Sequence, residues 1–331
     1  MDSRAFGSTG LRVSALGFGC GAVGGLMVRG TAADQERGVA RAVAAGITFF
    51  DTAPVYGDGA SETNLGRVLA RLRPEIVLAT KVRVGPEERG DIATAIGRSM
   101  DASLRRLGRD GVDLLQLHNL ISTTGLDGAL TPDEVLGEVV PAMERMRDAG
   151  KTRFIGITGL GETAAVQRVI DSGRFNSAQV AYNLLNPSAV VEVLPGFPAQ
   201  DFGRVVARAD VAGMGTVGIR AIAGGALSGS VERHPIGMAA VPPIGTGASY
   251  EADVERARSF APLLLDAAAT DLVELALRFA IGDGGPTTVL VGISTLEQLD
   301  HAIASVARGP LPARVRSRLA PIWAAMANGA G

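Results

Sequence analysis

Short apolar runs and amphipathic helical segments alternate eight times along this chain, and this alternation limits its fold more than any other feature. Parallel strands need long crossover connections, usually helices, so strict strand–helix alternation predicts a parallel sheet. Eight units within 331 residues favour a closed barrel over an open sheet. We expect the strands at 15–19, 47–50, 76–80, 112–117, 154–157, 178–181, 216–222 and 288–291.

The helical segments predict the outer layer of this barrel. We expect helices over 32–45, 61–72, 91–107, 132–149, 162–172, 202–212, 253–281 and 296–306, with a further helix over 310–326. The seventh is interrupted near Pro262. Turn residues between apolar flanks at 6–13 predict a hairpin, which we place across the bottom of the barrel. No linker marks a boundary, so we expect one α/β domain over residues 1–331, a (β/α)8 TIM barrel with an N-terminal β-hairpin.

Composition excludes several classes of function. The net charge is −2 and the basic residues are spread along the chain, which argues against a nucleic-acid partner or a membrane surface. The single cysteine, Cys20, excludes an internal disulfide and fits a reducing compartment. Three scattered histidines offer no zinc spacing, so we expect no metal. Without a signal peptide or a run of membrane-spanning length, we expect a cytoplasmic protein; its oligomeric state is not predicted.

Four polar residues fall at the ends of three consecutive predicted strands. Asp51 and Tyr56 follow the second strand, Lys81 ends the third and His118 ends the fourth. Each alone is more often a turn, packing or surface residue than a catalytic one. Because adjacent strands of a parallel barrel end on the same rim, where catalytic groups are normally found, we expect the four to lie together.

These four side chains predict proton transfer to an oxygen atom. A phenol with an ordinary pKa of ~10 is a poor proton donor near neutral pH, and we expect the Lys81 ammonium to lower the pKa of Tyr56. Asp51 would orient Lys81 by an ion pair, and His118 would hydrogen-bond the substrate oxygen or the phenol. The sequence offers no acyl nucleophile with its base and no metal site. The set can protonate an oxygen while a cofactor delivers hydride to the adjoining carbon.

Seven segments together resemble the aldo-keto reductase superfamily. They lie at 11–19, 50–57, 79–81, 113–118, 156–159, 179–183 and 292–299. The resemblance covers nearly the whole chain. It implies a (β/α)8 barrel that binds NADP(H) across its C-terminal rim, and it implies the catalytic tetrad Asp51, Tyr56, Lys81 and His118, with Tyr56 as general acid and base.

The resemblance also implies a set of cofactor-binding residues. They are Gly19, Cys20, Gly21, Asp51, Thr158, Gly159, Gln179, Ile219, Arg220, Ala221, Ile222, Gly292, Ser294 and Gln298. The family often has Ser-Asn at Thr158-Gly159 and a stacking aromatic where this chain has the aliphatic run 219–222. Arg220 would add a cation near the pyrophosphate. Ser294, Gln298 and the free N–H groups of the helix that follows predict a site for the 2′-phosphate of NADP, with Glu297 pointing away.

The sequence therefore predicts an NADP(H)-dependent oxidoreductase that acts on a small-molecule substrate and interconverts aldehydes or ketones with alcohols. One alternative within the enzymes is an aldose or sugar-alcohol dehydrogenase running oxidatively. A second is a non-catalytic NADP(H)-sensing subunit that resembles potassium-channel β subunits. We expect the loops at 22–31, 119–130 and 227–249 to form an apolar substrate pocket.

Overall fold

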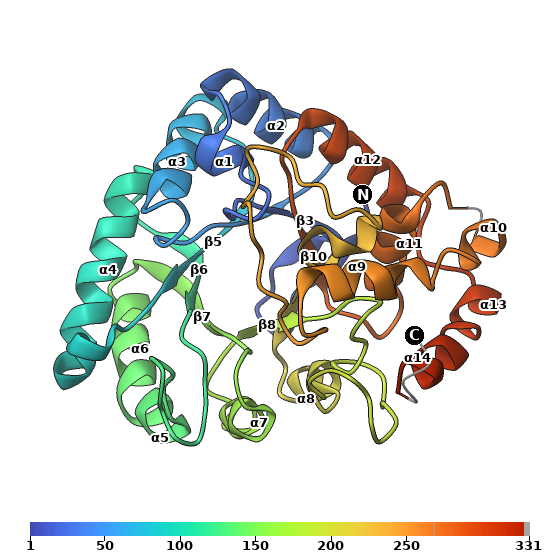
Figure 1. Ribbon diagram of the computed structural model, residues 1–331. Helices are drawn as coiled ribbons and strands as arrows, with labels where there is room; N and C mark the ends of the chain where they lie inside the picture. Colours follow the sequence, from blue (N-terminus) through green and yellow to red (C-terminus); the bar gives the residue numbers. More distant parts are fainter. Residues whose placement is uncertain (268, 328–331) are drawn as a thin grey trace.

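Eight parallel strands close into a barrel in the computed structural model, which describes residues 1–267 and 269–327 (Figure 1). The strands pair in chain order and the last pairs with the first, so the predicted (β/α)8 barrel is confirmed. They are β3 (Leu16–Gly19), β4 (Phe49–Asp51), β5 (Val77–Val82), β6 (Val112–Leu117), β7 (Thr152–Thr158), β8 (Ser177–Ala181), β9 (Gly215–Ile219) and β10 (Thr288–Gly292).

Helices surround the barrel because each presents an apolar face to the strands. The α-helices are α1 (Leu26–Arg29), α2 (Ala32–Ala44), α3 (Ala60–Leu72), α4 (Ile92–Leu107), α5 (Pro132–Glu134), α6 (Val140–Asp148), α7 (Thr163–Asp171), α8 (Val205–Val211), α9 (Tyr250–Arg258), α10 (Leu263–Ala267), α11 (Leu272–Ala280), α12 (Leu296–Ala307), α13 (Ala313–Arg316) and α14 (Leu319–Ala327). Short turns of other helix types are η1 (Pro86–Asp91), η2 (Val135–Val139) and η3 (Ala223–Ser228).

The N-terminal hairpin closes the bottom of the barrel, as predicted. Strand β1 (Ser3–Ala5) pairs antiparallel with β2 (Arg12–Ser14), and the turn between them carries Phe6. Phe6 is fully buried, and its ring centroid lies 5.7 Å from that of Phe49. A Cβ on Gly215 would come within 2.6 Å of the Phe6 ring, so this glycine leaves the space that the ring fills. The hairpin is thus a plug for the barrel interior.

Several predicted boundaries were wrong, each for a local reason. The strand predicted over 216–222 ends at Ile219, because Arg220 and Ala223 adopt left-handed backbone angles that extended structure does not allow. The segment 132–149 contains a π turn before Pro141, where the Val140 N–H bonds to the carbonyl of Val135. The segment 253–281 has the predicted interruption near Pro262, between α9 and α10, but its first helix starts at Tyr250 and α11 is a further separate helix.

Smaller differences concern the start of α8, the C-terminal tail, the loop at 22–31 and the positions of Asp51 and Lys81 within their strands. Helix α8 begins three residues later than predicted, after Arg204, which also has a left-handed backbone. The tail predicted as one helix forms α13 and α14, and the loop at 22–31 contains α1. Asp51 lies in β4 itself, and Lys81 lies inside β5. Among the described residues, no helix is long and apolar enough to cross a membrane.

Phe6→Ala tests the plug directly. Removing the buried ring leaves a cavity that the barrel cannot close, so we expect the free energy of unfolding to fall by about 3–5 kcal/mol. Leu265→Ala is the control, because Leu265 is 92% exposed and its truncation should change stability by less than about 0.5 kcal/mol. Urea denaturation followed by circular dichroism measures both. Equal stability of the two variants would contradict a packing role for the hairpin.

Candidate active site

A buried ion pair lies between the neighbouring strands β4 and β5. Lys81 Nζ is 2.6 Å from Asp51 Oδ2, and the two side chains are 0% and 4% exposed. In β5, Thr80 and Lys81 point to opposite faces of the strand, as alternation in a strand requires. Thr80 bonds to Glu62 of α3 outside the barrel, while Lys81 reaches the carboxylate of the adjacent strand. The site is therefore built into the barrel wall.

Every donor of the Lys81 ammonium has a partner. Besides Asp51, Nζ donates to the Thr52 carbonyl at 2.9 Å and to Tyr56 Oη at 3.2 Å. The second oxygen of Asp51 accepts a 2.6 Å hydrogen bond from Gln179 Nε2 of β8. Since an ammonium has three N–H donors, the group is fully satisfied. Gln179, predicted to contact the cofactor, therefore also holds the carboxylate of Asp51 in place.

Tyr56 and His118 complete the predicted group of four. The two rings meet edge to face, with centroids 5.9 Å apart. His118 directly follows β6, and its backbone N–H bonds to the Val82 carbonyl at 2.8 Å. Both side chains lie on the wall of one cavity. The structure thus brings together all four residues that the sequence placed at one rim.

The electrostatics of Tyr56 differ from the prediction. Burial raises the pKa of the phenol above its ordinary value, and the opposing influence of Lys81 does not overcome it. The prediction of a lowered phenol pKa was therefore wrong, although Lys81 does act in the expected direction. Burial alone would lower the pKa of Lys81, but Asp51 and Tyr56 raise it, so the ammonium stays charged. Burial also raises the pKa of the Asp51 carboxyl.

His118 is a neutral imidazole at physiological pH. Burial first, and then the nearby cations Lys81 and Arg83, lower its pKa to about 3. Its Nδ1 is buried and has no hydrogen-bond partner among the described residues, and the same holds for Thr158 Oγ1. Both side chains line the cavity. Buried polar atoms are normally paired, so these two orphaned atoms indicate a ligand or water that supplies the missing partner.

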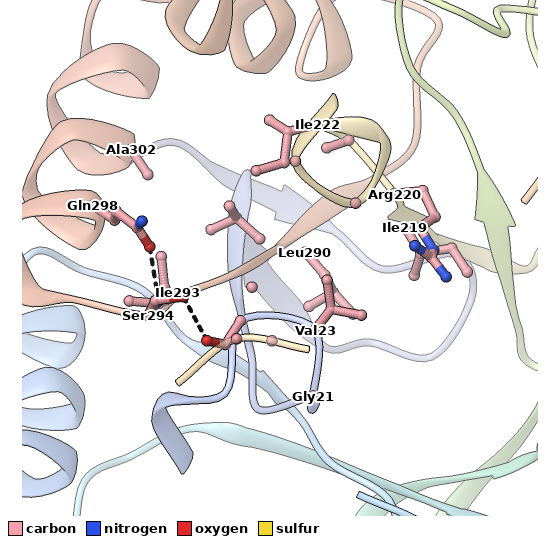
Figure 2. Close-up of a pocket in the computed structure, with 18 of the residues that line it drawn as sticks. Gly21, Val23, Ile219, Arg220, Ile222, Leu290, Ile293, Ser294, Gln298 and Ala302 are labelled. Atoms are coloured by element: carbon pink, nitrogen blue, oxygen red, sulfur yellow. Dashed lines mark hydrogen bonds between the residues drawn. The ribbon is translucent and has the colours of Figure 1, made fainter. Parts of the chain in front are cut away.

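The cavity has a volume of about 620 Å³, within the range of small-molecule sites. It runs from Tyr56 to the start of α12, where Ser294, Gln298 and Ala302 lie across from Ile219 and Arg220 (Figure 2). Most of the predicted site residues line it. They are Gly19, Gly21, Asp51, Tyr56, His118, Thr158, Gln179, Ile219, Arg220, Ala221, Ile222, Gly292, Ser294 and Gln298.

Three predicted residues lie outside this wall. Lys81 is fully buried beneath Tyr56 and acts only through its neighbours. Cys20 is 1% exposed, and burial raises the pKa of its thiol. Its backbone N–H bonds to the Asp51 carbonyl at 2.9 Å. Gly159 donates its N–H to the Gln179 carbonyl at 2.7 Å and lines a separate small pocket. Cys20 and Gly159, which were predicted to bind the cofactor, therefore make backbone hydrogen bonds within the barrel wall and do not line the cavity.

The start of α12 offers fewer free groups than predicted. Thr295 caps the helix by accepting the Gln298 N–H, and the Ser294 N–H donates to Gln298 Oε1 at 2.8 Å. The Ser294 hydroxyl donates to the Gly24 carbonyl at 2.6 Å (Figure 2). Glu297, which we expected to point away, lies on the cavity wall. Hydrogen bonds from its own backbone and from Thr295 hold the pKa of its carboxyl below the usual value.

The predicted pocket loops are only partly confirmed: residues of 22–31 and 227–249 line the cavity, and none of 119–130 does. The loop between η3 and α9 was predicted to be apolar, and its polar residues were not singled out. Glu232, Arg233, His234 and Tyr250 line the cavity, and this loop crosses over the strands in Figure 1. Arg233 fixes the loop, since it donates to the carbonyls of Met238 and Gly224 at 2.6 Å each and lies 5.1 Å from the Tyr250 ring centroid. These contacts form within an irregular segment, and the loop's Gly- and Pro-rich sequence carries no periodic signal that predicts them.

Comparison with known proteins identifies the family. The model of the Aldo/keto reductase family matches residues 15–324. An aldo-keto reductase of Bacillus halodurans, solved in its holo form, superposes with a TM-score of 0.71 at 25% identity, covering 97% of this chain and 96% of that one.

Two curated relatives are named as sugar dehydrogenases. L-galactose dehydrogenase of Arabidopsis thaliana is 31% identical over 92% of this chain and 88% of its own length. D-threo-aldose 1-dehydrogenase of a Pseudomonas species is 34% identical over 60% of this chain and 67% of its own length.

The lowered pKa of His118 predicts an acid-sensitive fold. The unfolded chain protonates this imidazole below its ordinary pKa of 6.5, whereas the folded protein does so only near pH 3. Stability from the neutral ring is therefore complete above about pH 6.5 and is lost as the pH falls toward 3, by at most ~1.4 kcal/mol per pH unit.

His118→Gln should lose this part of the pH dependence. Urea unfolding at several pH values between 4.5 and 7 gives the slope of stability against pH for both proteins. The slope, rather than the absolute stability, is compared, because carboxylates contribute equally to both. Identical slopes would show that folding does not lower the pKa of His118.

Proposed function

The chain belongs to the aldo/keto reductase family, and we propose that it interconverts a carbonyl compound and an alcohol with a nicotinamide dinucleotide as redox partner. One observation carries the proposal. The phenol of Tyr56 lies on the cavity wall, 3.2 Å from the buried ammonium of Lys81 and edge to face with His118. This arrangement can give a proton to an oxygen atom and take it back.

The contacts of the cavity support a dinucleotide as its ligand. Thr158 Oγ1 has no partner among the described residues and is placed to bond a carboxamide, while a Cβ on Gly21 would lie 3.7 Å from the Tyr56 ring, so this glycine keeps the wall beside Tyr56 open. Ile219 and Ile222 supply an aliphatic face for a planar ring. The bound cofactor would supply or accept the hydride. These residues would hold it, together with Gln179 and the residues at the start of α12.

The chain's own residues handle the proton. At rest the phenol of Tyr56 keeps its proton, because burial raises its pKa. During carbonyl reduction it donates that proton to the substrate oxygen, and Lys81 stabilises the phenolate that remains. Neutral His118 donates a hydrogen bond from its ring to the same oxygen. In the direction of alcohol oxidation, the phenol must first lose its proton; Lys81 stabilises the resulting phenolate, which then takes the proton of the alcohol.

The relatives' names favour a sugar as the substrate. Two of them are dehydrogenases of L-galactose and of D-threo-aldoses, so we propose an aldose or a related polyhydroxy compound, oxidised at a hydroxyl-bearing carbon. Reduction of simple aldehydes uses the same groups in reverse. A panel of aldoses and aldehydes, assayed in both directions, distinguishes the two substrates. Cofactor binding without turnover on any of them would instead favour a sensing role.

Tyr56→Phe tests the proton donor. We expect kcat to fall by about two orders of magnitude or more, the usual contribution of general acid–base catalysis, while the Kd for the dinucleotide stays within about twofold. Stopped-flow or steady-state absorbance at the nicotinamide band measures the first quantity, and quenching of cofactor fluorescence measures the second. Near-normal turnover in the variant would remove Tyr56 from the mechanism.

The form of the dinucleotide follows from the charges near α12. The resemblance implied NADP(H), whose 2′-phosphate carries about −2. Of the described residues that line the cavity at the start of α12, none is Lys or Arg, and Glu297 is an acid. The donors of Ser294 are already used within the protein. We therefore infer that this chain takes NAD(H) in preference, with a free ribose hydroxyl beside Glu297.

Cofactor affinities test this inference. We expect NADH to bind about tenfold more tightly than NADPH, a difference of ~1.4 kcal/mol. Glu297→Lys should move this ratio at least tenfold toward NADPH, because it replaces repulsion of the phosphate with attraction. Asp300→Lys is the matched control, since it makes the same charge change on α12 at a residue outside the cavity wall. Tighter binding of NADPH by the unaltered protein would contradict this inference and support the NADP(H) prediction.

A further inference from the structure

Within the described part of the chain, two arginines line the cavity, and one of them is held by hydrogen bonds to the protein. Arg233 donates to backbone carbonyls and lies over a tyrosine ring. The Arg220 side chain has no hydrogen bond or ion pair with any described residue, although its guanidinium is half-buried on the same wall. An arginine is always charged and presents five donors, so Arg220 leaves an uncommitted cation inside the cavity.

The backbone fixes where this cation points. Arg220 directly follows β9 with a φ of +60°, a conformation that is costly for a residue with a Cβ. Its carbonyl accepts the side-chain amide of buried Asn183 at 3.0 Å and the Ala223 N–H at 2.7 Å. These bonds hold the turn and direct the side chain along the rim. Figure 2 places Arg220 beside Ile219, across the cavity from Gln298.

The surrounding residues leave room for the guanidinium but do not neutralise it. A Cβ at Gly224 would come within 2.7 Å of Arg220 Nη1, so this glycine makes space for the side chain. Asp253 is committed to Thr246 and to the Gly247 N–H, and Asp51 is committed to Lys81. Partial burial lowers the pKa of Arg220 without removing its charge. An anion that enters the cavity would relieve this unpaired charge.

We propose that Arg220 binds an anionic oxygen group of a cavity ligand. Its planar fork suits a phosphate or a carboxylate, which it can hold through two parallel hydrogen bonds. Two sources share this chemistry, the pyrophosphate of the dinucleotide and an acidic group on the substrate. The inference rests on the proposed function in one respect only, that this cavity is the ligand site.

Arg220→Gln and Arg220→Lys separate the two sources. If the anion is the pyrophosphate, the Kd for NADH rises about tenfold or more in Arg220→Gln and is partly restored in Arg220→Lys. If it is a substrate carboxylate, the Kd for NADH is unchanged. The KM for 4-carboxybenzaldehyde then rises about tenfold, while that for its methyl ester stays the same. Arg12→Gln is the control for loss of one positive charge, because Arg12 lies on the hairpin at the opposite end of the barrel.

The outcomes distinguish this inference from the proposed function. Values within twofold of wild type for both ligands in Arg220→Gln would overturn the role of Arg220 and leave the proposed function standing. If the unaltered protein binds no dinucleotide, the proposed function is wrong, and calorimetry with inorganic pyrophosphate decides the inference instead. Weaker binding of pyrophosphate by Arg220→Gln than by Arg12→Gln then supports it, and equal affinities overturn it.

Discussion

The buried ion pair between Lys81 and Asp51 is the interaction on which the rest of the site depends. Both charges are removed from water, which is tolerable only because all three ammonium donors and both carboxylate oxygens have partners. Those partners come from β4, β5 and β8 and from the loop that carries Tyr56. Removal of one member would leave an uncompensated buried charge, at a cost of about 3–5 kcal/mol. The strands that close the barrel therefore also hold the charged groups of the site in place.

The same burial sets the protonation states around the pair. It raises the pKa of Tyr56, lowers that of His118, and leaves Lys81 charged because Asp51 faces it. The result is a protonated phenol and a neutral imidazole beside a fixed cation. In a partly dry cavity such a cation stabilises a developing phenolate more than it would in water. In the proposed function, proton exchange with a substrate oxygen would use these groups where they stand.

Charge is unevenly distributed along the cavity. Lys81 lies behind the wall at the Tyr56 end, Arg220, Glu232 and Arg233 lie on the wall, and the acid Glu297 lies at the start of α12. A ligand with an anionic middle and an uncharged sugar at its far end matches this order. Figure 2 shows the apolar residues Ile222 and Leu290 between Arg220 on one side and Gln298 on the other. The preference for NAD(H) and the anion-binding role of Arg220 are both inferred from this arrangement of charges.

The sequence by itself determined the barrel and the grouping of Asp51, Tyr56, Lys81 and His118. Both follow from local rules, the alternation of strand and helix and the common direction of parallel strands. It did not determine the raised pKa of Tyr56, the orientation of Glu297, the second contact of Gln179 or the isolation of Arg220. These depend on burial and on partners far apart in the chain, such as Gln179 and Asp51, which are 128 positions apart. Only the folded barrel brings such residues together, because solvent exclusion and long-range contacts have no periodic pattern in the sequence.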